Sequence, residues 1–358
     1  MDHITDAMEM IEHFRQPAFC VKDGIIVKVN NAAANRMIEP ALPISQLMKT
    51  GAEEYGEFCD GCLYVTLSVC DQDLGFSISR KKDFDLFQLV QDAENTELQA
   101  MALAARELRE PLASIMITAD HLFPAAEDAQ DAETADHMAR INRGLFQMLR
   151  LISNMSDAGR YASAASISME VLNVSVLLDE IFAKASALVE RSGITLAYTG
   201  LSESVYTLVN SELLERAILN TISNALKFTP QGGSITASVQ RKGNKLYLST
   251  VDSGCGIGET TRTNLFSRYA REPGVEDGRF GIGLGFVMIR SAAQHHGGTV
   301  LVDHPQDAGT RVTMTLAIRP GSGDKVRSPM LKVDYAGERD HGLLELSDAL
   351  PAELYKPQ

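Results

Sequence analysis

The chain has 358 residues, with 33 Lys+Arg against 47 Asp+Glu and a formal net charge of −14. This acidic balance repels phosphate at long range and argues against a protein that binds nucleic acid or an anionic membrane, while leaving room for one local basic pocket. Apolar residues make up 45% and charged residues 22% of the chain, which fits a globular protein of two or three domains. No apolar run approaches the ~20 residues that span a bilayer and the N-terminus lacks a signal pattern, so we expect a cytoplasmic protein without membrane insertion.

Residues 1–82 are expected to be mixed α/β. Segments rich in strand formers alternate with turns and an Ala-rich helical stretch: strands at 19–21, 25–27, 63–69 and 74–78, a turn at 22–24 and a helix at 31–38. The stretch FCVKDGIIVKVNNAAANRM resembles the opening of a PAS sensor domain: strand, Asp-Gly turn, strand ending in Val-Asn, helix. The resemblance implies a PAS-like α/β sensor domain whose signal and ligand the sequence does not reveal.

Five cysteines, at positions 20, 59, 62, 70 and 255, are too few and too scattered for a disulfide framework. The pair Cys59 and Cys62 has CxxC spacing, which admits a metal half-site or a disulfide. A tight hairpin through Asp60-Gly61 is favoured instead, and would place the two Cα atoms about 5.5 Å apart.

Residues 83–162 change to a heptad pattern. Apolar residues recur in alternating steps of three and four along two stretches, at Leu98, Met101, Ala105, Leu108, Leu112, Ile115, Ala119 and Leu122, and then at Met138, Ile141, Leu145, Met148, Ile152 and Met155. A Pro-containing stretch at 123–128 is expected to break the helix between them. Two such helices form an antiparallel hairpin, and a second copy would bury its remaining apolar face in a four-helix bundle, so we expect a homodimer through 83–162. A hairpin packed on its own chain is the alternative.

Residues 163–320 are expected to be α/β and carry clustered polar and glycine motifs. Asn220, Asn224 and Lys227 occupy one face of a predicted helix over 211–226, where two amides and an ammonium suit a Mg²⁺-polyphosphate, although a solvated polar stripe has the same spacing. Asp252 ends a predicted strand and can accept a hydrogen bond from an exocyclic amine. The other strands are expected at 234–240, 245–251, 299–303 and 311–317.

Glycines follow Asp252 and recur further along the chain. Gly254 and Gly256 allow the backbone to approach a flat ring. Phe266 opens a lid-like polar stretch, and the run Gly281-Ile282-Gly283-Leu284-Gly285 opens a helix whose N–H groups can face phosphates. Each cluster alone is as consistent with plain turns.

Together these motifs resemble, in order and spacing, the ATP-binding domain shared by histidine kinases, gyrase and MutL (the GHKL superfamily), closing with a Gly-Thr strand at Thr310. The resemblance implies an α/β sandwich that binds ATP with Mg²⁺. It assigns Mg²⁺ to Asn224, phosphate to Lys227, the adenine amine to Asp252 and the phosphate-contacting hinge of the lid to Gly281, Gly283 and Gly285.

The hairpin then resembles the dimerisation and phosphotransfer region of sensor histidine kinases, with Arg106-Glu107-Leu108-Arg109-Glu110-Pro111-Leu112 in place of His-Glu-Leu-Arg-Thr-Pro-Leu. Arg106 stands where the family has its phospho-accepting histidine, and a guanidinium has no lone pair to offer phosphorus. Glu107, which in the family accepts the histidine proton, lacks that substrate. His121 and His137 lack the motif and are expected to be solvated.

The sequence therefore predicts an α+β multidomain protein: a PAS-like sensor at 1–82, a helical hairpin at 83–162, a GHKL-type ATP-binding domain at 163–320 and a tail at 321–358. We expect a two-component histidine kinase-like protein that cannot phosphorylate itself at the usual site, and that phosphorylates in trans or acts as a pseudokinase with a response regulator or partner kinase. An anti-sigma-type serine kinase or an ATP-switched dimeric binding module is the alternative. The apolar residues 342–346 and Leu350 predict that the tail docks at an unspecified place.

Overall fold

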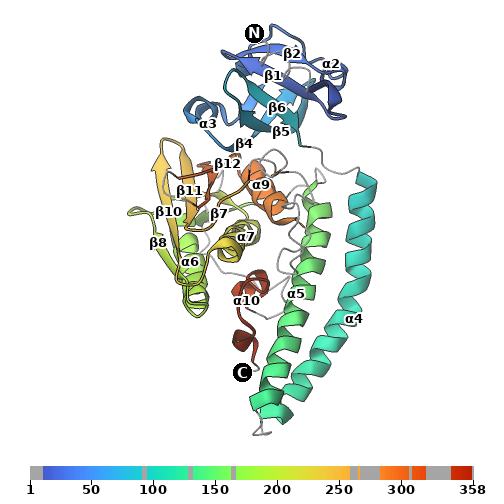
Figure 1. Cartoon of the computed structure of the whole chain (residues 1–358), viewed down its shortest axis with the longest axis vertical. Coiled ribbons are helices and arrows are strands. Elements are labelled where there is room, and N and C mark those ends of the chain that lie inside the picture. The colour runs from blue at the N-terminus through green and yellow to red at the C-terminus, as the bar shows by residue number, and fades with distance from the viewer. Residues whose placement is uncertain are drawn as a thin grey trace.

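The protein is described here by a computed structural model covering residues 11–90, 95–127, 132–162, 167–258, 265–266, 283–305, 309–319 and 340–356. The side chains of Leu98 and Leu122 in the predicted seam, and Gly281, lie outside the described residues. Three layers are visible in Figure 1: an N-terminal β-domain, an α/β domain beneath it, and two long helices along one side.

The N-terminal domain is an antiparallel sheet with short helices. Its elements are η1 (Ile11–His13), β1 (Ala18–Lys22), β2 (Ile25–Val29), α2 (Asn31–Ala34), η2 (Ile44–Gln46), β3 (Met48–Thr50), α3 (Ala52–Glu57), β4 (Cys62–Val69), β5 (Gln72–Arg80) and β6 (Asp85–Leu89). Asn30 caps α2 and also accepts from the amide of Ala18, which fixes the expected strand-to-helix turn. Stacked rings of Phe19 and Phe87 lie in the core of this domain, with centroids 4.9 Å apart.

Two details of this domain differ from the sequence analysis. Strand β6 pairs with β1 and β5, so the first domain continues past residue 82. The hairpin expected at Cys59–Cys62 is wrong, because helix α3 ends at Glu57 and Asp60-Gly61 leads from that helix into β4. Both cysteines are free, Cys59 exposed and Cys62 buried.

The two long helices are α4 (Asn95–Glu127) and α5 (Ala132–Ala162), which pack side by side as a hairpin. The break expected from residue 123 is wrong, because α4 continues through Pro124 as it does through Pro111, although each proline removes a backbone donor and crowds the carbonyl four residues before it. In the described part of the chain, no helix combines the length and apolar character needed to cross a membrane.

Most of the described seam positions fall into two sets, and Met101, Met138 and Met155 are half-buried. Ala105, Leu112, Ala119, Leu145 and Ile152 are buried between the helices or against the rest of the chain. A second set stays open to solvent at about half its surface: Leu108 (50%), Ile115 (53%), Ile141 (52%) and Met148 (45%). One chain thus buries only part of the heptad seam.

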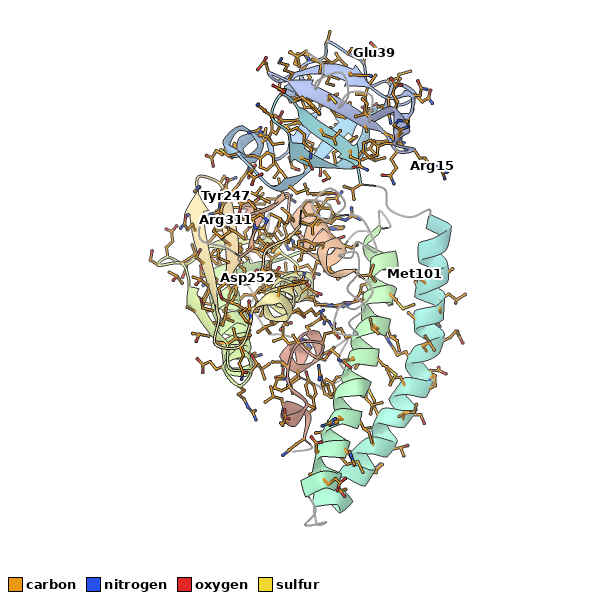
Figure 2. The ribbon with its side chains drawn as sticks, viewed as in Figure 1. Arg15, Glu39, Met101, Tyr247, Asp252 and Arg311 are labelled. Carbon is orange, nitrogen blue, oxygen red and sulfur yellow. The ribbon has the colours of Figure 1, made fainter. Side chains whose placement is uncertain are left out.

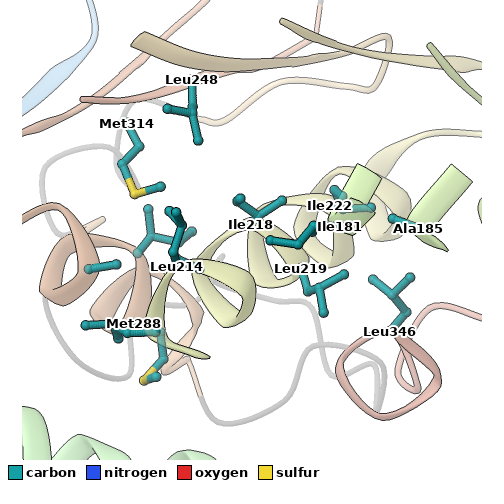
Figure 3. Packing of buried hydrophobic residues seen from close by; sticks show 14 of the residues in the cluster. Ile181, Ala185, Leu214, Ile218, Leu219, Ile222, Leu248, Met288, Met314 and Leu346 are labelled. Atoms are coloured by element: carbon teal, nitrogen blue, oxygen red, sulfur yellow. The ribbon is translucent and has the colours of Figure 1, made fainter. Parts of the chain in front are cut away.

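The α/β domain places helices on one face of a sheet. Its elements are β7 (Glu170–Asn173), α6 (Val174–Glu190), β8 (Thr195–Thr199), β9 (Tyr206–Val209), α7 (Ser211–Phe228), β10 (Ser234–Lys242), β11 (Lys245–Asp252), α9 (Gly285–His295), β12 (Val300–Asp303) and β13 (Arg311–Ala317). Figure 3 shows the packing between α7 and this sheet, with Leu214 and Ile218 beneath Leu248 and Met314. The strands expected at 234–240, 245–251, 299–303 and 311–317 are confirmed.

The main sheets of the two domains are joined into one, while β7 and β9 form a separate two-stranded sheet. Among the described residues a single 11-stranded sheet runs β2-β1-β6-β5-β4-β12-β13-β11-β10-β8, with β3 attached to β4. The junction is an antiparallel pairing of β4 with β12, in which Tyr64 lies opposite Val300 and Cys62 opposite Val302. Lys245 of β11 adds an ion pair to Glu54 of α3 at 2.8 Å. The first domain is therefore docked directly on the α/β domain.

The C-terminal tail returns to the middle of the molecule. It contains α10 (His341–Glu345), which contacts both α5 and α7, and η4 (Ala352–Tyr355), which packs against α5 (Figure 1). The docking expected from its apolar residues is confirmed: Leu344, Leu346 and Leu350 are fully buried.

Candidate functional site

The polar face of α7 is the centre of the candidate site. Asn210 caps the helix by accepting from the amide of Leu213 at 2.7 Å. The predicted stripe lies on the side of α7 that meets α9: a Cβ at Gly285 would lie 3.4 Å from Nδ2 of Asn224 and 3.6 Å from Oδ1 of Asn220. The first turn of α9 therefore approaches both amides.

Lys227 continues this stripe one turn further along α7. Its ammonium is mostly buried and donates to Oδ2 of Asp348 at 3.1 Å. Burial lowers the pKa of Lys227, and repulsion from the guanidinium of Arg150 acts in the same direction. A partly desolvated ammonium interacts more strongly with an anion than a solvated one does.

Asp252 lies at the end of β11. Its Oδ1 accepts from the amides of Gly254 at 2.9 Å and Thr310 at 3.2 Å. Burial raises the pKa of this carboxyl, whereas those two amide hydrogen bonds lower it. The two amides hold the carboxylate in a fixed orientation, which suits a group that must accept from an exocyclic amine. Figure 2 places Asp252 within the α/β domain.

The remaining motif residues lie around the same region. Gly254, Leu284 and Thr310 are buried, and Gly256 and Gly283 adopt positive φ angles of 76° and 73°. Phe266 is fully buried, with its ring centroid 5.9 Å from Phe286 of α9 and 5.6 Å from Tyr64 of β4. Of the predicted hinge glycines, Gly281 lies outside the described residues.

Arg106 and Glu107 are not brought to this site. Both are exposed on α4, and α5 lies between that helix and the α/β domain (Figure 1). Met101, on the same part of α4, is far from Asp252 in Figure 2. His121 and His137 are exposed, as expected.

Four charged residues of the site were missed by the sequence analysis. Arg216 is fully buried one turn before Asn220, so extending the polar stripe backwards by four residues would have found it. Arg150 lies among the apolar positions of α5, and its Nη2 donates to Oδ1 of Asn220 at 3.1 Å. Glu345 and Asp348 come from the tail, where no local sequence signal connects them to α7.

Residues 209–320 match the family described as histidine kinase-, DNA gyrase B-, and HSP90-like ATPase. The chain is 26% identical over 266 residues to hybrid signal transduction histidine kinase D of Dictyostelium discoideum, covering 71% of this chain and 17% of that protein. It is 30% identical over 226 residues to the adaptive-response sensory kinase SasA of Rippkaea orientalis, covering 61% of this chain and 57% of that protein.

Among solved structures, the crystal structure of full-length ShkA in complex with AMPPNP aligns with a TM-score of 0.50 at 21% identity, covering 62% of this chain and 47% of that one. This likeness concerns the fold alone. The chain spans well under two thirds of the length of these curated relatives, 17% of one and 57% of the other. Residues 209–320 are thus similar to ATPase domains of the histidine kinase, DNA gyrase B and HSP90 type, and the two curated relatives are kinases of signal transduction.

Proposed function

We propose that this chain is a two-component, sensor histidine kinase-like protein that binds Mg-ATP between α7, α9 and the end of β11, and that does not phosphorylate itself at the usual position. The observation that carries the proposal is the convergence of Asn220 and Asn224 on Gly285, with Lys227 on the same helix and the oriented carboxylate of Asp252 at the end of β11.

The donor set fits this ligand. Amide oxygens are ligands that Mg²⁺ accepts, an ammonium neutralises phosphate, and an oriented carboxylate accepts from the adenine amine. Asn224 would hold the metal, Lys227 the phosphates and Asp252 the base, while Gly254, Gly256 and Gly283 keep the backbone close to the ligand. Bound Mg-ATP supplies the transferable phosphoryl group.

Arg106 is the reason for proposing that self-phosphorylation is absent. A guanidinium stays protonated and offers no nucleophilic lone pair. Glu107 has no neighbouring imidazole to deprotonate. The ATP site therefore serves either a histidine on another chain or a nucleotide-dependent change of shape, with a response regulator or a partner kinase as the expected recipient.

The proposal also includes a sensor function for the first domain and a dimer interface at the exposed part of the heptad seam. The strand and helix order of residues 11–90 supports a PAS-like sensor, whose strand β4 contacts Phe266 through Tyr64. The exposed seam residues Leu108, Ile115, Ile141 and Met148 support a homodimer through a four-helix bundle, since a second copy would bury them.

Incubation with γ-labelled Mg-ATP tests the proposal. The unmodified chain is expected to acquire no acid-labile label, and Arg106→His is expected to acquire one. Acid-labile label on the unmodified chain would contradict the role given to Arg106.

A mixing experiment separates the two forms of the proposal. A chain carrying both Arg106→His and Asp252→Asn has an acceptor but a weakened nucleotide site. Label that appears on it only after the unmodified chain is added indicates phosphorylation in trans, whereas no transfer indicates a pseudokinase.

A further inference from the structure

The tail is anchored between α5 and α7 by its own side chains and backbone. The ring of Tyr355 packs against Phe146 with centroids 5.2 Å apart, and Nδ2 of Asn142 donates to the Tyr355 carbonyl at 2.8 Å. Nε of Arg143 donates to the Ser347 carbonyl at 3.0 Å. Leu346 joins the buried cluster that contains Leu219 of α7 (Figure 3). This docking fixes residues 340–356 against the polar face of α7.

Two tail carboxylates point into the candidate nucleotide site. Glu345 is fully buried, and its Oε2 accepts from Nδ2 of Asn220 at 3.1 Å and from Nε of Arg150 at 3.3 Å. Oδ2 of Asp348 accepts from Nη1 of Arg150 at 2.7 Å and from Lys227 at 3.1 Å. Asn220 and Lys227 are two of the residues assigned above to the polyphosphate end of the nucleotide.

The charges of this cluster balance only with the tail in place. Arg150, Arg216 and Lys227 carry three positive charges, and Glu345, Asp348 and Asp157 carry three negative ones, so the sum is zero. Without the two tail carboxylates the same buried cluster would hold three positive charges against Asp157 alone, a surplus of two. Cationic side chains that lose their anionic partners are unfavourable in a site shielded from water. Without the tail, the three cationic side chains therefore attract another anion.

Carboxylates and phosphate oxygens use the same donors, because both accept charge-assisted hydrogen bonds from guanidinium and ammonium groups. We propose that residues 340–356 are an internal competitor of the nucleotide polyphosphate: Glu345 and Asp348 take the anion positions beside Asn220 and Lys227, so that Mg-ATP and the docked tail exclude each other. This inference rests on the proposed nucleotide site.

Displacement of the tail has a second consequence. The tail also ties α5 to α7, since Arg150 of the hairpin and Arg216 of the α/β domain share Glu345. Nucleotide binding would therefore loosen the α/β domain from the hairpin at the moment when the phosphates enter. A ligand that binds equally well with the tail docked and with the tail displaced would not change the balance between these two states. The polyphosphate changes this balance because it binds only when the tail is displaced.

Calorimetry on the full chain tests the competition. Mg-ATP and adenosine are each titrated into the unmodified chain, into Glu345→Gln/Asp348→Asn, and into Glu353→Gln as a control that removes an exposed tail charge outside the site. We expect the double variant to bind Mg-ATP at least tenfold more tightly than the unmodified chain, a change of about 1.4 kcal/mol. Adenosine, which lacks phosphates, is expected to bind all three chains within twofold of one another.

Equal Kd values for Mg-ATP in all three chains would overturn the competitor and leave the nucleotide site standing. No binding of Mg-ATP to any chain, the double variant included, would contradict the nucleotide site and the competitor together. If the double variant binds adenosine more tightly by the same factor as Mg-ATP, the competitor is also overturned. Such a result would show that the substitutions open the site to any ligand, and not to the polyphosphate in particular.

Hydrogen exchange on the unmodified chain gives a second test that needs no variant. Saturating Mg-ATP is expected to speed amide exchange at Leu344, Leu346 and Leu350, whose amides are bonded within the docked tail, while adenosine leaves it unchanged. Unchanged or slower exchange with bound Mg-ATP would overturn the proposal.

Discussion

Arg216 of α7 and Glu345 of the tail form an ion pair in which neither side chain is exposed, with Nε 2.8 Å from Oε1. Arg216 also donates to Oδ1 of Asn154 at 2.7 Å and pairs with Asp157, both on α5. One guanidinium thus holds together three segments that are distant in the sequence.

Replacement of Arg216 is therefore expected to lower the free energy of unfolding strongly. Arg216→Ala leaves Asp157 and Glu345 without their shared cation in a buried site, and breaking such a pair costs about 3–5 kcal/mol. The matched control is Arg241→Ala, whose partner Glu203 is 55% exposed and whose own side chain is 43% exposed, so its loss should cost at most about 1 kcal/mol. Urea unfolding measures both, and equal losses would contradict the importance given to burial.

The junction between the two sheets depends on Gly61. Its φ is +97°, and a Cβ there would lie 2.1 Å from the carbonyl oxygen of Val302 in β12. Gly61→Ala should therefore cost about 1–3 kcal/mol for the clash in addition to about 1 kcal/mol for the backbone conformation. Gly24→Ala is the control, because Gly24 has a φ of +77° and open space around it. If both variants lower the free energy of unfolding in urea by the same amount, Gly61 does not lie as close to Val302 of β12 as described.

His296 makes the start of α7 sensitive to acid. Its Nε2 accepts from the amide of Asn210 and its Nδ1 lies 2.7 Å from the Ala292 carbonyl, an arrangement that needs the neutral ring. Burial lowers the pKa of His296 from 6.5 to about 4. Between those values the unfolded chain binds the extra proton and the folded chain does not, so the stabilising contribution is complete above pH 6.5 and declines as the pH falls toward 4.

This decline should reach about 3 kcal/mol at most, since each pKa unit corresponds to about 1.4 kcal/mol. Unfolding free energies at pH 7 and pH 4.5 measure it, with His296→Gln as the comparison that cannot titrate. An identical pH dependence in both chains would refute the role of His296.

The exposed seam residues make a prediction about assembly. Leu108→Glu/Ile115→Glu places charges where the proposed bundle is apolar, and should convert a dimer to a monomer in light scattering. Met37→Glu is the control, because Met37 is the most exposed large hydrophobic residue described, at 73%, and lies in the first domain. A monomeric unmodified chain, or a double variant that stays dimeric, would contradict the proposed interface.

The arrangement of the residues proposed to bind nucleotide could largely be predicted from the sequence. Asn220, Asn224 and Lys227 occupy one face because a helix repeats every 3.6 residues, and Asp252 is followed by glycines that permit a tight turn. These are local rules, and the structure follows them in α7 and in the segment after β11.

The contacts between distant segments could not be predicted in the same way. Glu345 and Asp348 lie more than a hundred residues from their partners on α7, and no periodicity connects them. The pairing of β4 with β12 depends on two strand edges that meet only in the folded chain. At Cys59–Cys62 the Asp-Gly signal was local and still misleading, because a helix rather than a strand precedes it.

The central claim is that the polar face of α7 and Asp252 bind one nucleotide, and calorimetry with Mg-ATP tests it most directly. The chain with Glu345→Gln/Asp348→Asn is compared with the same chain carrying Asp252→Asn in addition. We expect clear binding in the first and at least tenfold weaker binding in the second. The amides of Gly254 and Thr310 would hold the one oxygen of the substituted side chain as they hold Oδ1 of Asp252, and its NH2 group, which cannot accept, would face the adenine amine. Equal affinities in the two chains, or no binding in either, would contradict the account.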